Sequence, residues 1–287
     1  MPDEQDLFSI LATDWEGFEL RFSTRELAVV GQRLGVATAG VVPPSLVPED
    51  VSPPDSPVSR AIEGALLARD VLRVRADSAF ALGAPSGALL AAALGAALRI
   101  TATSVGVDVV ARRRWHVRDD IVISQRMVDP AQQIFGFSAG VPTSVLSDII
   151  TECGLPDTRA DSPESQNLDL MALMWTFLDR SPKEVAGEVD SSIWIEAELA
   201  DRPLTRSDSS IDLERHHIRL VQQVDVDIPG ANGVVHRQVA WAFDDDGRRW
   251  MTAAPDEPRA DGMTKLVEVG GRDILDSFVS KLSTASA

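Results

Sequence analysis

The first regular pattern along the chain is a strand followed by a capped helix. Apolar and charged residues alternate over 18–22, which is the period of a half-buried strand. Ser23 follows, and Glu26 stands three residues further on, which is capping-box spacing at a helix start. Apolar residues then recur at helical intervals until Gly35. The sequence therefore predicts a strand over 18–22 and a helix over 23–34.

Between residues 40 and 138 the pattern changes several times. The stretch 40–57 is rich in proline and predicts a surface loop, because proline interrupts regular structure. Helical spacing over 62–71 predicts a helix, and the nearly all-apolar run 88–98 predicts a buried one. From 101 to 138 short apolar runs alternate with polar residues. This alternation predicts an antiparallel meander of strands.

The remainder of the chain repeats the mixture of helices and strands. A polar stretch at 157–167 is interpreted as a linker, and Asp246-Gly247 is a dipeptide that tight hairpin turns favour. The expected elements are helices over 142–153, 168–178 and 274–282 and strands over 224–228 and 239–243. We therefore expect an α+β fold with an N-terminal half, 1–156, and a C-terminal half, 157–287. The halves are interpreted as a weak duplication within one domain.

Charge and composition exclude several classes of protein. The 287 residues carry 44 acidic and 27 basic side chains, a net charge of −17, which argues against nucleic-acid binding. The longest apolar run is shorter than the ~20 residues of a membrane span. The acidic start lacks the pattern of a signal peptide, and the single Cys153 cannot form an internal disulfide. These features predict a cytoplasmic protein without a membrane span.

Metal binding finds little support in the residue spacing. Glu214 and His217 have the i, i+3 spacing of helical carboxylate sites, with His216 between them, but no second motif completes a site. Asp244-Asp245-Asp246-Gly247 resembles the start of a calcium loop, yet the twelfth position is Pro255 instead of glutamate. We expect a hairpin turn there, and we assign no metal and no cofactor.

Candidate catalytic residues are equally isolated. Gly83-Ala84-Pro85-Ser86-Gly87 lacks both the Walker lysine and the dinucleotide-binding glycines, and Ser86 is not in a nucleophile elbow. Cys153 lies on the apolar face of its predicted helix, where a thiol is usually a core residue. His116 and His236 are general-base candidates only if folding brings a nucleophile to them. We therefore assign no catalytic residue, and a small-molecule enzyme of unknown reaction stays as the alternative.

One basic and aromatic segment is unusual in so acidic a chain. Residues 112–116 read Arg-Arg-Arg-Trp-His, and we interpret them as the first turn of the meander. Arginine and tryptophan are frequent in protein interfaces. The competing interpretation is a solvated hairpin whose cations balance Asp119 and Asp120. The terminal amphipathic helix is a second candidate surface, against the simpler reading that it packs on the core.

Three stretches resemble the EspG family, chaperones of the type VII (ESX) secretion systems. Residues 18–27 are similar to the family's first strand and capped helix, and 65–72 to a helix that ends in Leu-x-x-Arg-Gly-Leu, although Asp70-Val71 replaces Arg-Gly. Residues 239–250 resemble the late hairpin with its Asp-x-x-Gly-Arg core, and this match is the most specific. Length and order agree over nearly the whole chain.

The resemblance implies a fold, a function and a site. The fold is a central antiparallel β-sheet flanked by two helical bundles with quasi-twofold symmetry. The function is non-enzymatic: binding of the helical tip of PE–PPE heterodimers, or of similar helical hairpins, in the cytoplasm before export, with a possible homodimer of the free chaperone. The implied partner-binding loop corresponds to Arg112, Arg113, Arg114, Trp115, His116 and Arg118.

Overall fold

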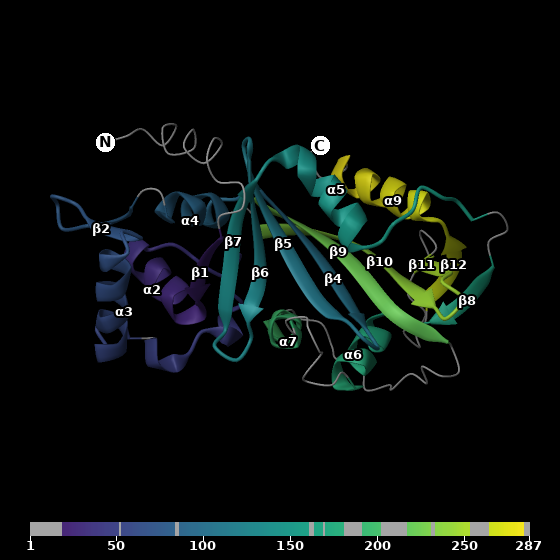
Figure 1. Cartoon of the computed structure of the whole chain (residues 1–287), viewed down its shortest axis with the longest axis horizontal. Coiled ribbons are helices and arrows are strands. Elements are labelled where there is room, and N and C mark those ends of the chain that lie inside the picture. The colour runs from purple at the N-terminus through teal and green to yellow at the C-terminus, as the bar shows by residue number, and fades with distance from the viewer. Residues whose placement is uncertain are drawn as a thin grey trace. The chain divides into compact units, whose positions relative to one another are not determined.

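The computed structural model of the chain describes two compact units (Figure 1). Unit 1 comprises 1–99, 113–145 and 193–203, and unit 2 comprises 100–112, 146–192 and 204–287. Neither unit is one continuous piece of chain. The residues described are 19–51, 53–83, 86–160, 164–168, 170–180, 191–201, 217–230, 233–252 and 264–283.

Unit 1 is built on an antiparallel sheet that begins at the first predicted strand. Its strands follow the order β1-β7-β6-β5. They are β1 (Glu19–Ser23), β7 (Ile134–Gly140), β6 (Ile121–Asp129) and β5 (Val110–Arg118), the last of which begins in unit 2. Phe22 of β1 lies opposite Phe135 of β7, and both side chains are buried. This pair fixes the register by placing large apolar groups on the core face.

Helices and short turns complete unit 1. They are α2 (Thr24–Leu34), α3 (Pro57–Ala68), α4 (Ser86–Leu94) and most of α7 (Ser192–Asp201), with two 3-10 turns at Pro44–Leu46 and Glu49–Val51. A separate hairpin pairs β2 (Leu72–Val74) with β3 (Phe80–Leu82). The start of α2 shows the predicted capping box, because the Ser23 and Glu26 side chains each accept from the other's backbone N–H. Gly35 ends the helix at φ 66°, a left-handed conformation that glycine adopts without strain.

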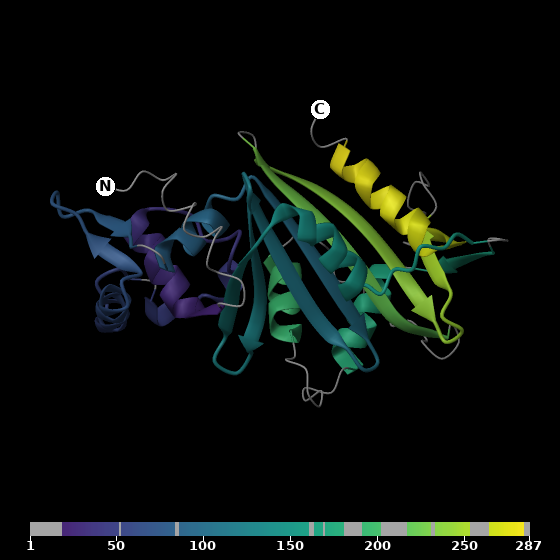
Figure 2. The ribbon, with the colours of Figure 1, turned by 45° about the horizontal axis from the view of Figure 1, so that its top comes forward.

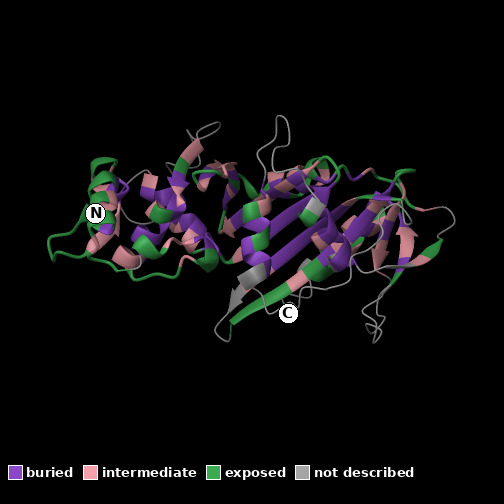
Figure 3. Ribbon diagram, turned by 90° about the horizontal axis from the view of Figure 1, so that it is seen from below, coloured by how far each residue is buried: buried purple, intermediate pink, exposed green. Residues whose placement is uncertain are grey.

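The strands of unit 2 follow the order β4-β9-β10-β11-β12-β8. The strands are β4 (Leu98–Gly106), β8 (Ser165–Leu168), β9 (Ile218–Gly230), β10 (Gly233–Asp244), β11 (Arg249–Thr252) and β12 (Thr264–Val269). Its helices are most of α5 (Pro142–Glu152), α6 (Leu170–Arg180) and α9 (Gly271–Ser283). Helix α9 lies along β10 (Figure 2) and buries Ile274 and Phe278. In Figure 3 the central strands are coloured mostly as buried.

Most predicted elements are present, and three differ. The helix expected over 88–98 ends at Leu94, and β4 begins at Leu98, because the apolar run contains both a helix and a buried strand. The polar stretch 157–167 contains the start of β8. Residues 112–116 are not a turn. They are the middle of β5, and the chain reverses over 107–109 instead.

The predicted α+β class is confirmed, with a large antiparallel sheet and seven α-helices among the described residues. Within that part of the chain, no helix combines the length and the apolar character that crossing a bilayer requires. The compact units do not follow the halves 1–156 and 157–287. The duplication of the halves stays a prediction.

Candidate functional site

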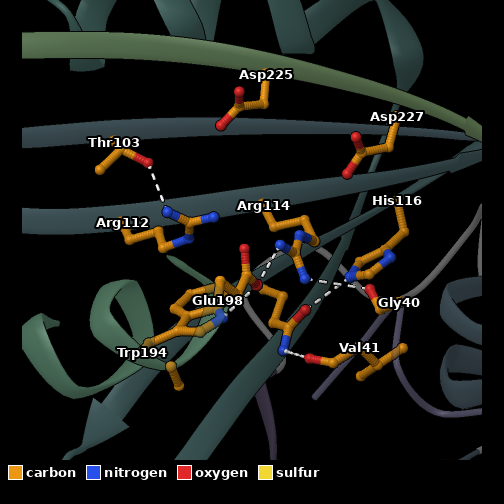
Figure 4. Close-up of polar contacts among 12 residues, drawn as sticks. Gly40, Val41, Thr103, Arg112, Arg114, His116, Trp194, Glu198, Asp225 and Asp227 are labelled. Atoms are coloured by element: carbon orange, nitrogen blue, oxygen red, sulfur yellow. Dashed lines mark hydrogen bonds and ion pairs between the residues drawn. The ribbon is translucent and has the colours of Figure 1, made fainter. Parts of the chain in front are cut away.

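Strand β5 carries the basic residues that stand out in the sequence. Because side chains alternate along a strand, Arg114 and His116 share one face, and Arg113 and Trp115 share the other. The register with β6 places Gln125 directly opposite Arg114. Arg114, His116 and Gln125 are all buried. Together with Trp194 and Glu198 of α7 they form what we call the buried polar cluster (Figure 4).

The centre of the buried polar cluster is an ion pair between Arg114 and Glu198. The Arg114 guanidinium binds one oxygen of the Glu198 carboxylate and also donates to the backbone oxygen of Gly40 at 3.2 Å. The same carboxylate oxygen accepts the indole N–H of Trp194 at 2.8 Å. The Trp194 ring lies 5.3 Å below the guanidinium and meets Phe135 edge-on at 5.0 Å. Charge, hydrogen bonds and ring contacts thus hold α7 on the sheet of unit 1.

His116 extends the buried polar cluster through Gln125. The Gln125 amide N–H donates to the backbone oxygen of Val41 at 2.7 Å, so its carbonyl oxygen faces His116 Nε2, also at 2.7 Å. This arrangement assigns the His116 proton to Nε2. Burial, and secondarily the Arg114 charge, lowers the pKa of His116 from its usual 6.5 to about 3. The imidazole is therefore neutral at physiological pH.

Unit 2 holds a smaller polar group on the β9–β10 hairpin. Both oxygens of the buried Asp225 accept from the Gln223 amide, at 2.7 and 2.8 Å. His236 on β10 lies between two carboxylates, with Nε2 3.3 Å from Asp225 Oδ1 and Nδ1 2.6 Å from Asp227 Oδ1. The Asp227 contact joins directly opposed residues of the hairpin. These contacts link the two strands.

The structure corrects the placement of the predicted partner-binding residues. They belong to a strand and not to an exposed turn, because their side chains alternate between two faces of a sheet. Arg112, Arg114, Trp115 and His116 are buried, whereas Arg113 and Arg118 are half-buried. Arg112 donates to Thr103 Oγ1 at 2.9 Å. Contact between this set and a client stays a prediction, and Arg113 and Arg118 are the members that reach the surface.

The catalytic candidates from the sequence do not come together. His116 binds an amide instead of a hydroxyl group. Burial raises the pKa of the Cys153 thiol to about 12, so the reactive thiolate is scarce at neutral pH. Ser86 begins α4, whereas His116 hydrogen-bonds to Gln125 and His236 to Asp227. One surface pocket of about 290 Å³ lies in unit 2 between the 107–109 turn and the β9–β10–β11 region, and its lining contains none of these four candidates, His236 included.

The metal candidates give a similar result. Asp244 to Gly247 form the predicted hairpin turn between β10 and β11. Glu214 and His216 lie outside the described residues. Among the residues that the structure does describe, no group of three or more His, Cys, Asp or Glu side chains is placed to hold a metal ion.

The site and the fold therefore define an α+β protein with a buried structural network. No protein-family model matches the chain, and no curated protein does. Among solved structures, the chain is similar to the type VII secretion system chaperone EspG5 of Mycobacterium tuberculosis, solved in complex with the PE25–PPE41 dimer. The match covers 93% of this chain and 96% of the other, with 11% identity and a TM-score of 0.47. At this level of likeness, function has to be argued from the residues.

Sequence reasoning missed the partners of the basic segment. Glu198 and Trp194 lie in α7, which the sequence analysis did not predict because its apolar residues surround the helix and give no clear stripe. The available signal was in β5 itself. Arg112, Arg114 and His116 stand at alternate positions, which is the spacing of one strand face.

Proposed function

We propose that this chain is a non-enzymatic, cytoplasmic chaperone of a type VII secretion system that binds the helical tip of PE–PPE-type substrates. The β10–β11 hairpin supports this most, because it is the most specific stretch that resembles the EspG family. Asp244 organises its turn. One carboxylate oxygen accepts from the backbone N–H groups of Asp246 and Arg248, at 3.0 and 2.8 Å. The other accepts the indole N–H of Trp250 at 3.1 Å. The resembling residues thus act together in one motif.

The other two stretches of the resemblance meet in space. Arg69, at the end of α3, forms an ion pair with Glu26 of the α2 capping box. It also donates to the backbone oxygen of Arg21 at 3.1 Å, and its guanidinium lies 5.3 Å from the Phe22 ring. A residue of the second stretch therefore joins the strand and the helix of the first. This contact supports a shared architecture more strongly than separate short matches would.

The chemistry of the described residues favours binding over catalysis. The neutral, buried His116 and the buried Cys153 have no access to a substrate in this conformation.

The accessible cations of β5 differ from these buried residues. Arg113 is half-buried, donates to Ser124 Oγ at 2.9 Å and stacks 5.3 Å from Trp115. Arg118 is also partly accessible. We propose that these two cations contact an acidic part of the helical tip, where charge matching sets specificity.

Co-purification tests the proposed function directly. The tagged chain is co-expressed with a PE–PPE pair, and the eluate is analysed by size-exclusion chromatography with light scattering. We expect a stoichiometric complex of the three chains. If the chaperone elutes alone while the pair is soluble beside it, the chaperone proposal is wrong.

Charge reversal at Arg113 tests the proposed contact. Arg113→Glu should capture less of the pair than the wild type, because it places an anion against an acidic tip. Arg60→Glu makes the same charge change at an exposed position of α3 and is the matched control. Equal capture by both variants would remove Arg113 from the interface. Thermal unfolding of each variant shows whether a loss reflects binding or folding.

A further inference from the structure

One long strand edge in unit 2 is only partly covered. Strand β10 pairs with β9 from Gly233 to Asp244. On its other edge, β11 pairs with three residues of β10, from Trp241 to Phe243. Within the described part of the chain, no strand lies on that edge over 233–240. At ~3.4 Å per residue this open edge is roughly 27 Å long.

The hydrogen bonds near the hairpin turn show which backbone groups face the open edge. The Asp244 N–H donates toward β11, to Arg248 O at 3.1 Å, and the Asp245 N–H donates toward β9, to His217 O at 2.8 Å. Backbone groups alternate between the two edges of a strand. The N–H and C=O groups of Val234 and Gln238 therefore face the open edge. Neither residue is paired with a residue of β11.

The sequence of this edge offers little protection against strand pairing. Natural edges are usually shielded by charged side chains (lysine above all), proline, bulges or short length, and Arg237 is the one such residue of this edge. From Gly233 to Ala240 there is neither proline nor lysine, and the register with β9 is regular. Val234 and Val235 are 57% and 43% exposed. The segment therefore combines strand-forming side chains with backbone groups that are ready to pair.

The side chains beside the open edge indicate the chemistry of the strand that fits. Val235, Arg237 and Val239 share one face of β10. Their own N–H groups point toward β9, so an added antiparallel strand would meet them as non-hydrogen-bonded pairs, in which side chains lie closest. Arg237 donates to the neighbouring His236 backbone oxygen at 3.2 Å and has no carboxylate partner among the described residues. An acidic side chain opposite Arg237 would supply one.

A second copy of the chain fits this edge poorly. Two-fold antiparallel pairing of β10 with itself, centred on Arg237, sets two guanidinium groups opposite each other. Centring on either neighbour sets Arg237 opposite a valine. Like charges that are directly opposed destabilise a strand pair. None of these three registers places a carboxylate opposite Arg237, so the charge pattern favours a different chain.

We infer that the open edge of β10, 233–240, is a docking site for an extended segment of another protein. The segment adds antiparallel to β10 and alternates so that an acidic residue faces Arg237 and apolar residues face Val235 and Val239. Main-chain hydrogen bonds supply the affinity, and these three side chains supply the specificity. This strand-addition surface is distinct from the surface around Arg113 and Arg118 that we propose contacts a helical tip.

A charge-swap experiment tests the inference. The probes are two fluorescein-labelled, end-capped peptides, TVTETVT and TVTKTVT, titrated against the full chain by fluorescence anisotropy. The wild type should bind the glutamate peptide roughly fivefold more tightly, and Arg237→Glu should prefer the lysine peptide by a similar factor. Arg60→Glu is the matched control and should behave like the wild type. Equal binding of the two peptides by the wild type, or an unchanged preference in Arg237→Glu, would overturn the inference.

Two further measurements address the backbone. Gln238→Pro removes an N–H that faces the open edge and keeps the bonds to β9, so it should weaken glutamate-peptide binding roughly fivefold with an unchanged melting temperature. If this variant unfolds, hydrogen exchange of the wild type decides. The amides of Val234 and Gln238 should exchange fast in the free chain and slow down with the peptide. Slow exchange in the free chain would show that the edge is already occupied, and the inference would fail.

Discussion

Arg114 shows how one buried charge is accommodated in this protein. Its side chain is 3% exposed, and that of Glu198 is 11% exposed. Removing both from water is costly, and the cost is met by their attraction together with the bonds to Gly40 and Trp194. A charge that loses its partner in such a place has no water to replace it. The pair is therefore more important for what its loss would do than for any net stabilisation.

Replacing Arg114 with methionine should destabilise the fold by roughly 3–5 kcal/mol, because Glu198 would lose its buried ion pair with Arg114. The measurement is urea unfolding at neutral pH. Arg114→Met/Glu198→Leu should recover part of this loss, since it removes both charges. Arg113→Met, at a half-buried position on the other face of the same strand, is the control and should cost about 1 kcal/mol or less. A similar loss in the two single variants would contradict the assigned role of Arg114.

The neutral His116 predicts a dependence of stability on pH. Its pKa in the folded chain is about 3, against 6.5 for the ordinary side chain. Below pH 6.5 the unfolded chain therefore binds a proton that the folded chain does not, and stability falls as the pH falls. The loss at about pH 5 should be on the order of 2 kcal/mol relative to about pH 7.

His116→Gln isolates this contribution, because glutamine keeps an amide donor near Gln125 but does not titrate. Urea unfolding of both proteins across this pH range gives the difference between them. We expect a flatter profile for the variant. Parallel profiles would mean that His116 does not carry the acid sensitivity.

At the scale of elements, α9 separates core packing from surface exposure within two adjacent residues. Phe278 is 4% exposed and packs in unit 2, whereas Val279 is 47% exposed. The amphipathic pattern predicted this helix. The structure decides between its two readings, because the large aromatic residue faces inward.

Phe278→Ala should lower the free energy of unfolding by roughly 3–5 kcal/mol, since it removes a large buried ring. Val279→Ala is the matched comparison and should change it by about 0.5 kcal/mol or less. Chemical denaturation of both variants provides the measurement. A small effect at Phe278 would mean that the ring is not part of a packed core.

Over the whole molecule, the sequence was informative where structure is local. The capping box at Ser23 and Glu26 and the turn at Asp244–Gly247 depend on residues within one turn of chain, and both were predicted. The period of two identified most strands. Arg112 to His116 were misplaced because a run of cations is usually solvated. Here the carboxylate that compensates Arg114 lies 84 residues away, and no local pattern reports it.

Helix α7 has a further consequence that concerns synthesis. Unit 1 contains residues near the start of the chain and also 193–203, so it cannot be completed until late. A ribosome adds roughly 5–20 residues per second, and Glu198 follows Arg114 by 84 residues. Arg114 is therefore synthesised roughly 4–17 seconds before Glu198, and during that interval its ion pair cannot form. A chain truncated after residue 156 would lack α7 and with it Glu198, the counterion of Arg114. We expect such a product to be degraded by proteases.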